Sequence, residues 1–298
     1  MTATGSSYDV VQEKAEALAS GLPALLVAAE RLAATVSLGV HGRRRAGMGE
    51  TFWQFRRYQP HDAASAIDWR QSARSQHLFV REREWEAAEA VWFWRDSSAS
   101  MEFCSRWATT AKIERASLLL LALAALLARG GEKIALLGEH AEPSLGRAAL
   151  RRIAFGLAHL KADALPPQST IRRHAQLVWF SDFLAPIDDI ARLMQRFTAA
   201  GVAGHMVHIV DPAEEDFPYV GRTRFEGPQH HGSQILGRAE TIRPAYQARF
   251  AAHGAAIADL ARKEGWTYLR HRTDRPAQMA LIALYAHIGG DLISMKGT

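Results

Sequence analysis

The sequence is poor in cysteine, with Cys104 the only one among 298 residues. A single thiol excludes an internal disulfide and is typical of proteins from a reducing compartment. Cys104 has no lysine or histidine beside it in the sequence, which favours a half-buried structural thiol over a nucleophile.

Signals for export and for membrane insertion are also missing. The N-terminal residues do not combine a basic segment with an apolar one, as a secretory signal does. The longest apolar run, at 116–128, is shorter than the ~20 residues that cross a bilayer. We therefore expect a cytoplasmic protein without membrane insertion, in which 116–128 forms a buried helix.

The common catalytic motifs do not occur. There is no nucleophile elbow G-x-S-x-G, no zinc-protease helix H-E-x-x-H and no phosphate-binding loop G-x-x-x-x-G-K-[ST]. This favours a protein that is not an enzyme. A metal-dependent hydrolase remains the alternative, with His140, His205 and His208 as candidate bases, although histidines inside apolar strands are more often core residues.

The net charge of +5 comes mostly from arginine and raises the alternative of nucleic-acid binding, supported locally by HGRRR at 41–45. The other arginines are scattered and often lie near acids. No zinc-finger, RNA-recognition or helix-turn-helix signature accompanies them, so we expect no nucleic-acid partner.

The hydrophobic pattern divides the chain near residue 88. Before it, 8–38 predicts two short helices and 51–58 a strand, while 78–86 and 89–95 are a possible antiparallel pair. After it, apolar strands alternate with helices. The predicted strands are 91–95, 133–140, 175–182, 205–211 and 266–272, and the predicted helices are 107–129, 145–160, 186–199, 241–264 and 276–288.

This alternation predicts an α/β fold with an open, mostly parallel sheet covered by helices on both faces. We expect residues 1–88 to form an N-terminal helical and β extension, and 89–298 to form the α/β domain. In such sheets, ligands bind at the carboxyl ends of the strands. Three predicted strands end there in an acid, namely Asp96, Asp182 and Asp211; because Pro212 follows Asp211, that acid is interpreted as a turn residue.

The stretch D-x-S-x-S at 96–100 has two interpretations. Asp96, Ser98 and Ser100 offer the oxygen ligands that a hard cation such as Mg2+ prefers. Alternatively, they cap the next helix by accepting hydrogen bonds from free backbone N–H groups. The residues alone leave both interpretations open.

D-x-S-x-S after the first strand of an open α/β sheet resembles the metal-ion-dependent adhesion site of von Willebrand factor type A domains. The stretch GETFWQFRRYQPHDAASAIDWRQSAR at 49–74, followed by LFVREREWE, is similar to the signature of the bacterial family known as domain of unknown function 58. The segments 211–227 and 265–276 also resemble that family, and the resemblance covers about residues 40–290.

The resemblance implies a type A-like domain whose metal ligands are Asp96, Ser98, Ser100 and Asp182. The ion would be Mg2+, with Mn2+ or Ca2+ as substitutes. Type A sites also use a threonine that this sequence lacks in 139–152, where Ser144 is the nearest hydroxyl. Arg147 lies close to the expected place, and its charge is a possible substitute for the ion.

The resemblance also implies partners. Members of the family accompany MoxR-type AAA+ ATPases and are thought to act with them as adaptors on a client protein complex, so we expect a protein-interaction module. The signature at 56–74 has two interpretations: a charge network that locks the extension onto the domain, or a partner-binding surface. The residues concerned are Arg56, Asp62, Asp68, Trp69 and Arg74, with Trp69 as the packing anchor in the first interpretation.

Overall fold

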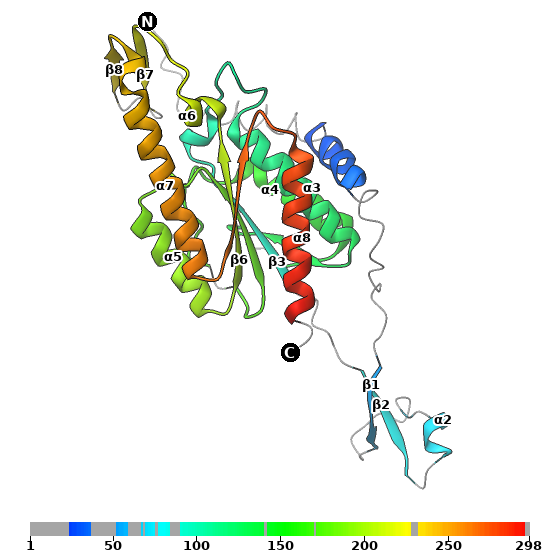
Figure 1. Cartoon of the computed structure of the whole chain (residues 1–298). Helices are drawn as coiled ribbons and strands as arrows, with labels where there is room; N and C mark the ends of the chain where they lie inside the picture. The colour runs from blue at the N-terminus through cyan, green and yellow to red at the C-terminus, as the bar shows by residue number, and fades with distance from the viewer. Residues whose placement is uncertain are drawn as a thin grey trace, which may run out of the picture. The chain divides into compact units, whose positions relative to one another are not determined.

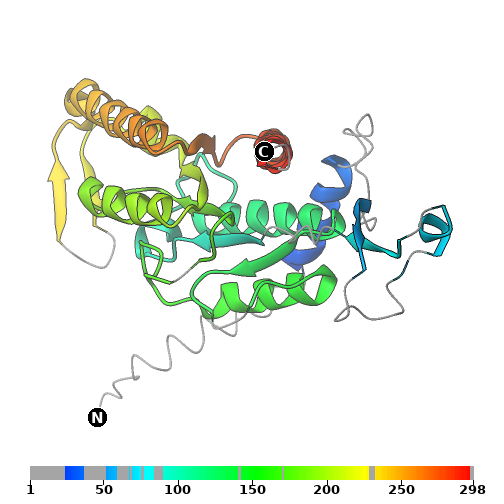
Figure 2. The ribbon, with the colours of Figure 1, turned by 90° about the horizontal axis from the view of Figure 1, so that it is seen from below.

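The computed structural model describes residues 24–36, 52–58, 67, 69–74, 77–83, 90–139, 142–169, 171–227 and 232–295. The chain divides into two compact units (Figure 1): Arg44–Ala88 is one, and Met1–Arg43 together with Glu89–Thr298 is the other. The predicted extension over 1–88 is therefore shared between the units. Ala29, Ala33 and Val36 of the helical segment 24–36 are buried in the core of the larger unit, where the segment lies beside α3 (Figure 2).

The smaller unit is built on a two-stranded antiparallel ribbon of β1 (Phe52–Arg57) and β2 (Phe79–Arg83), with a short helix α2 (Trp69–Ser72) between them in sequence. The predicted pairing of 78–86 with 89–95 is wrong. β2 pairs with β1, whereas residues 90–95 belong to the parallel sheet of the larger unit. Their nearly continuous apolar sequence suits a strand with both faces covered better than an exposed hairpin.

The larger unit contains a five-stranded sheet with the order β4-β3-β5-β6-β9, in which every pairing is parallel. This confirms the predicted α/β architecture. The strands are β3 (Ala90–Arg95), β4 (Lys133–Leu136), β5 (Gln176–Ser181), β6 (Ala203–Val210) and β9 (Thr267–Arg272). The principal helices are α3 (Lys112–Arg129), α4 (Gly146–His159), α5 (Ile187–Ala199), α7 (Arg243–Lys263) and α8 (Ala277–Met295).

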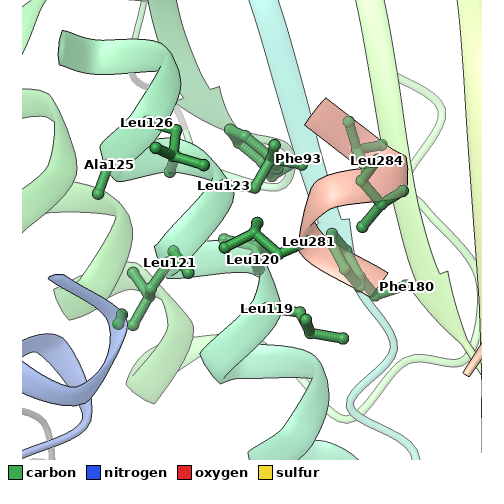
Figure 3. Close-up of a cluster of buried hydrophobic side chains, with 14 of the residues drawn as sticks. Phe93, Leu119, Leu120, Leu121, Leu123, Ala125, Leu126, Phe180, Leu281 and Leu284 are labelled. Carbon is green, nitrogen blue, oxygen red and sulfur yellow. The ribbon is translucent and has the colours of Figure 1, made fainter. Parts of the chain in front are cut away.

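Helices cover both faces of this sheet, and alternate strand residues supply two cores. On one face, Phe93 and Phe180 pack with α3, α4 and α8 (Figure 3). On the other, Trp94 and Trp179 pack with α5 and α7. The period of two in side-chain direction explains why neighbouring aromatic residues of one strand enter different cores.

The apolar run at 116–128 is a buried helix, as predicted. Residues 116–127 of α3 are buried apart from the half-buried Leu118, because the helix lies between the sheet and the layer formed by α4, α8 and the segment 24–36. A helix that is apolar on all sides needs such cover on all sides. The helix begins at Lys112 rather than at 107, after the short 3-10 helix η2 (Ala99–Glu102) and a loop.

The chain after β6 contains elements that the sequence did not predict. They are the helix α6 (Pro212–Asp216), the strands β7 (Thr223–Glu226) and β8 (Ser233–Leu236) of a hairpin, and the 3-10 helix η4 (Ala239–Ile242). Asp211 caps α6: its side chain accepts from Ala213 N, and the side chain of Glu214 accepts from Asp211 N. Asp211 has a structural role, as expected, but as a helix cap rather than as a turn residue.

Candidate functional site

The strand order places the candidate site at a change of direction in the sheet. Numbered within the larger unit, the order is 2-1-3-4-5, so the chain reverses its direction of growth between β3 and β5. In doubly wound sheets, ligands bind at this point, beyond the carboxyl ends of the strands. Asp96 follows β3 and Asp182 follows β5, and Asp96 N donates to Phe180 O at 2.8 Å. The two acids therefore lie side by side at the reversal.

Asp96 organises the loop after β3. Its Oδ1 accepts from both the backbone N–H of Ser98, at 2.8 Å, and the hydroxyl of Ser98, at 2.6 Å. Its Oδ2 accepts from the hydroxyl of Ser181 at 2.6 Å. The hydroxyls of Ser98 and Ser100 lie 3.0 Å apart, within hydrogen-bond distance. Burial, and then the charge of Asp182, raise the pKa of Asp96 to about 6.

Lys112 supplies a buried positive charge next to Asp182. The side chain of Lys112 is 0% exposed, and its Nζ lies 2.8 Å from Asp182 Oδ2 and 2.5 Å from Glu214 Oε1. Burial opposes the charge of Lys112, but Asp182 and Glu214 outweigh it and raise its pKa above the ordinary value. Burial likewise works against ionised Asp182, and Lys112 outweighs it to lower the pKa of that carboxyl. The pair is therefore ionic.

The four predicted ligands come together, but as arranged they do not fit a divalent ion. Mg2+ requires about six oxygens in near-octahedral geometry. Here one oxygen of Asp182 binds an ammonium, and both oxygens of Asp96 accept from hydroxyl or amide donors. Within the described part of the chain, no group of three or more His, Cys, Asp or Glu residues is arranged to hold a metal. The side chains of Asp96, Ser98 and Ser100 form a hydrogen-bonded cluster instead, and Asp182 beside it binds the internal cation of Lys112.

Ser144 and Arg147, the predicted substitutes, lie elsewhere. Ser144 forms an isolated β-bridge with Ile134 of the edge strand β4, and its hydroxyl accepts from Arg152. Arg147 is exposed on α4. The positive charge that we expected from Arg147 comes from Lys112, because the first residue of α3 reaches the reversal point and the first turn of α4 does not.

Three residues of the site were not predicted from the sequence, namely Lys112, Ser181 and Glu214. Ser181 had a detectable signal, because it immediately precedes the acid at the end of β5. Glu214 belongs to an Asp-x-x-Glu capping pattern that begins at Asp211. Lys112 had no detectable sequence signal. It is one of several charged residues before an apolar helix, and only the tertiary fold brings it to Asp182.

The signature at 56–74 is described in part. Asp62 and Asp68 lie outside the described residues, and the side chain of Arg56 does as well. Trp69 is 65% exposed and Arg74 is exposed, so Trp69 is not a packing anchor inside its own unit. Both interpretations of the signature stay predictions, because exposure of Trp69 within its own unit is compatible with either.

The candidate bases and the thiol are also placed. His140 lies outside the described residues, while His205 and His208 are buried, with Nδ1 at 2.8 Å from Thr267 Oγ1 and at 2.7 Å from Tyr268 OH respectively. Burial lowers the pKa of His208 to about 3.

Cys104 is exposed rather than half-buried, because it lies in the loop before α3. Partial burial and the charges of Asp211 and Glu114 raise the pKa of its thiol.

Fold and site together define an α/β domain with a polar cluster at the reversal of a doubly wound sheet. The family model described as "Protein of unknown function DUF58" matches residues 54–256, and the chain belongs to this family. Among its relatives are the uncharacterized proteins Mb1516 of Mycobacterium bovis and Rv1480 of Mycobacterium tuberculosis. Each is 28% identical over 255 residues, which cover 77% of this chain and 76% of the relative.

Two solved structures that the chain is similar to come from Bacteroides. One is an aerotolerance-related membrane protein of Bacteroides fragilis, 16% identical, with a TM-score of 0.39 over 65% of this chain and 96% of that one. The other is BatB of Bacteroides thetaiotaomicron, 13% identical, with a TM-score of 0.39 over 70% of this chain and 100% of that one. Among the residues described for the present chain, no helix combines the length and apolarity of a membrane span.

Proposed function

We propose that this chain is a non-enzymatic interaction module with a von Willebrand factor type A-like domain, and that it is a cytoplasmic adaptor for a MoxR-type AAA+ ATPase and its client complex. The observation that carries the proposal is a set of exposed apolar side chains on the loops at the carboxyl edge of the sheet, around the polar cluster. We call this set the apolar rim; it consists of Phe103, Trp107, Leu184, Ile187 and Val220.

The apolar rim has the composition of a docking surface. Its members come from the loop after β3, the loop after β5 with the first residue of α5, and the loop after α6, where Val220 is 70% exposed. The loops are connected: Trp107 packs edge-on against Tyr219 with ring centroids 5.6 Å apart, and Ser105 N donates to Asp211 Oδ2 at 2.9 Å. Exposed apolar groups on loops that are held together in this way are typical of protein-binding sites.

The apolar rim also presents a positive charge. Arg106 is exposed, and its guanidinium lies 4.2 Å from the centre of the Trp107 ring. An arginine whose guanidinium lies over an aromatic ring keeps its N–H donors available to a partner. Arginine is also a frequent contributor to interfaces. This arrangement suits a partner segment that combines an acidic side chain with apolar ones.

The chemistry of the cluster supports binding rather than catalysis. The hydroxyls of Ser98 and Ser181 donate to the carboxylate of Asp96, and no histidine accepts from them among the described contacts. His208 has a pKa of about 3 and a bond to Tyr268, so it is a weak base near neutral pH. An activated serine needs an adjacent base within hydrogen-bond reach, which the alternative of a hydrolase lacks here.

Arginine pairing supports a protein partner over nucleic acid. Arg272 bonds to Asp216 and Asp274 at 2.9 Å each, and Arg262 bonds to Asp259 at 2.6 Å. Arginines whose charge is neutralised by acids in this way contribute little affinity for the phosphates of a nucleic acid. The basic stretch at 41–45 lies outside the described residues.

The proposal is tested by measuring the affinity of the full chain for a MoxR-type ATPase of the same organism. Val220→Asp and Leu184→Asp are expected to weaken binding at least tenfold, because each puts a charge into the apolar rim. Leu145→Asp is the matched control, since Leu145 is also exposed but follows Ser144, which pairs with Ile134 near the amino end of β4. Equal losses in all three variants, or no binding by the wild type, would exclude the carboxyl edge as the docking site for this partner.

A further inference from the structure

We propose that the resident cation of the carboxyl-edge site is the ammonium of Lys112, and that the site is held together without a divalent metal ion. The inference concerns the interior of the site, and it is independent of which partner the apolar rim binds. It rests on the position of Lys112, the bonding of the surrounding oxygens and the balance of charge.

The position of Lys112 is that of an internal ligand to two separate loops. Its Nζ reaches Asp182 in the loop after β5 and Glu214 in α6, after β6. The side chain is completely buried, so the ammonium has exchanged its hydration for these two carboxylates. A buried lysine charge is stable only when it is paired in this way. Lys112 thereby connects the start of α3 to the segments that follow β5 and β6.

The oxygens that a metal would need are already bonded. Asp96 accepts three hydrogen bonds, two from Ser98 and one from Ser181. Ser98 and Ser100 pair through their hydroxyls, and Asp182 Oδ1 accepts from Leu184 N at 3.2 Å. A divalent ion would have to break several of these bonds and displace the ammonium at the same time.

The balance of charge points the same way. The cluster contains the acids Asp96, Asp182 and Glu214, and Lys112 provides the positive charge that is bonded to two of them. A further double positive charge beside Lys112 would be repelled in an environment of low dielectric constant. A partner carboxylate therefore does not complete the coordination of an ion here; the cluster instead sets the shape of the loops that carry the apolar rim.

The first test uses the wild-type full chain and Mn2+, whose free form has a characteristic paramagnetic resonance signal. The expected result is that the protein leaves this signal undiminished, and that its melting temperature is the same in Mg2+ and in EDTA. Uptake of one Mn2+ per chain that Mg2+ displaces and Asp96→Asn abolishes would overturn the inference. Neither readout involves the partner, so this outcome is separate from a failure of the proposed function.

The second test compares Lys112→Met with the double variant Lys112→Met/Asp182→Asn. The single variant leaves Asp182 buried without its cation and is expected to melt at a lower temperature than the wild type. Neutralising Asp182 in the same chain removes the unpaired charge, so the double variant should regain part of the loss. A double variant that melts below the single variant would contradict the pairing of these two residues. The first test stands even if neither variant folds.

Discussion

The ammonium of Lys112 lies 2.8 Å from Oδ2 of Asp182, and the two side chains are 0% and 3% exposed. This ion pair joins the first residue of α3 to the carboxyl end of β5, at the point where the sheet reverses its order. It brings a positive charge to the place where sequence motifs alone suggest a metal ion.

Loss of the Lys112 charge is expected to destabilise the fold strongly. Lys112→Met leaves the buried carboxylate of Asp182 and the half-buried one of Glu214 without a cation, and breaking a buried ion pair typically costs about 3–5 kcal/mol in the free energy of unfolding. Urea denaturation followed by circular dichroism measures this difference. The matched control is Lys263→Met at the exposed end of α7, which should stay within about 0.5 kcal/mol of the wild type. Equal stabilities of the two variants would argue against a buried ion pair.

Stability is expected to fall in mild acid partly because of His208. Its pKa is about 3 in the folded protein and 6.5 is the ordinary value, so the unfolded chain binds the proton more readily. The contribution of neutral His208 to the free energy of unfolding is complete at pH values above 6.5. It is lost progressively as the pH falls toward the pKa of about 3 in the folded protein. Relative to His208→Gln, the wild type should lose about 2 kcal/mol between about pH 7 and pH 5.

Denaturation curves of both proteins at several pH values test this prediction. His159 is exposed on α4, and the control variant His159→Gln should follow the wild-type curve. A constant difference between the wild type and His208→Gln across this range would show that His208 does not change its affinity for protons on folding.

A side chain at position 204 is expected to disrupt the packing of β6 against β9. A Cβ added to Gly204 would collide with the indole of Trp266, which is buried in the core on the side of α5 and α7. Overpacking of a core typically costs about 1–3 kcal/mol, and Gly204→Ala should lower the melting temperature accordingly. Gly254→Ala is the matched control. A Cβ added at Gly254 meets only Tyr268 OH, at 4.0 Å. Gly254 lies inside α7, where alanine should raise the free energy of unfolding by about 0.5–1 kcal/mol. Similar melting temperatures for both variants would contradict the close approach of Trp266.

The parallel sheet was predictable because its strands are short apolar runs separated by helical patterns. The pairing of β2 was not, since alternation in 79–83 indicates a strand but does not identify its partner. The hairpin of β7 and β8 was missed for a related reason: its strands are only four residues long, contain no buried residue and carry little apolar signal.

The candidate site was predictable in its location but not in its chemistry. Acids at the ends of β3 and β5 correctly predicted that Asp96 and Asp182 come together, because parallel strands share one carboxyl edge. The cation depends on how deeply the start of α3 packs, which is a tertiary property. No spacing in the sequence relates Lys112 to Asp182, seventy positions away.

The central claim is tested most directly by a crystal structure of the full chain soaked in Mn2+, with anomalous differences recorded at the manganese absorption edge. The account predicts no anomalous peak between Asp96 and Asp182, and density for Lys112 Nζ within hydrogen-bond distance of Asp182 Oδ2. A manganese peak coordinated by the hydroxyls of Ser98 and Ser100, with Lys112 displaced from Asp182, would contradict it.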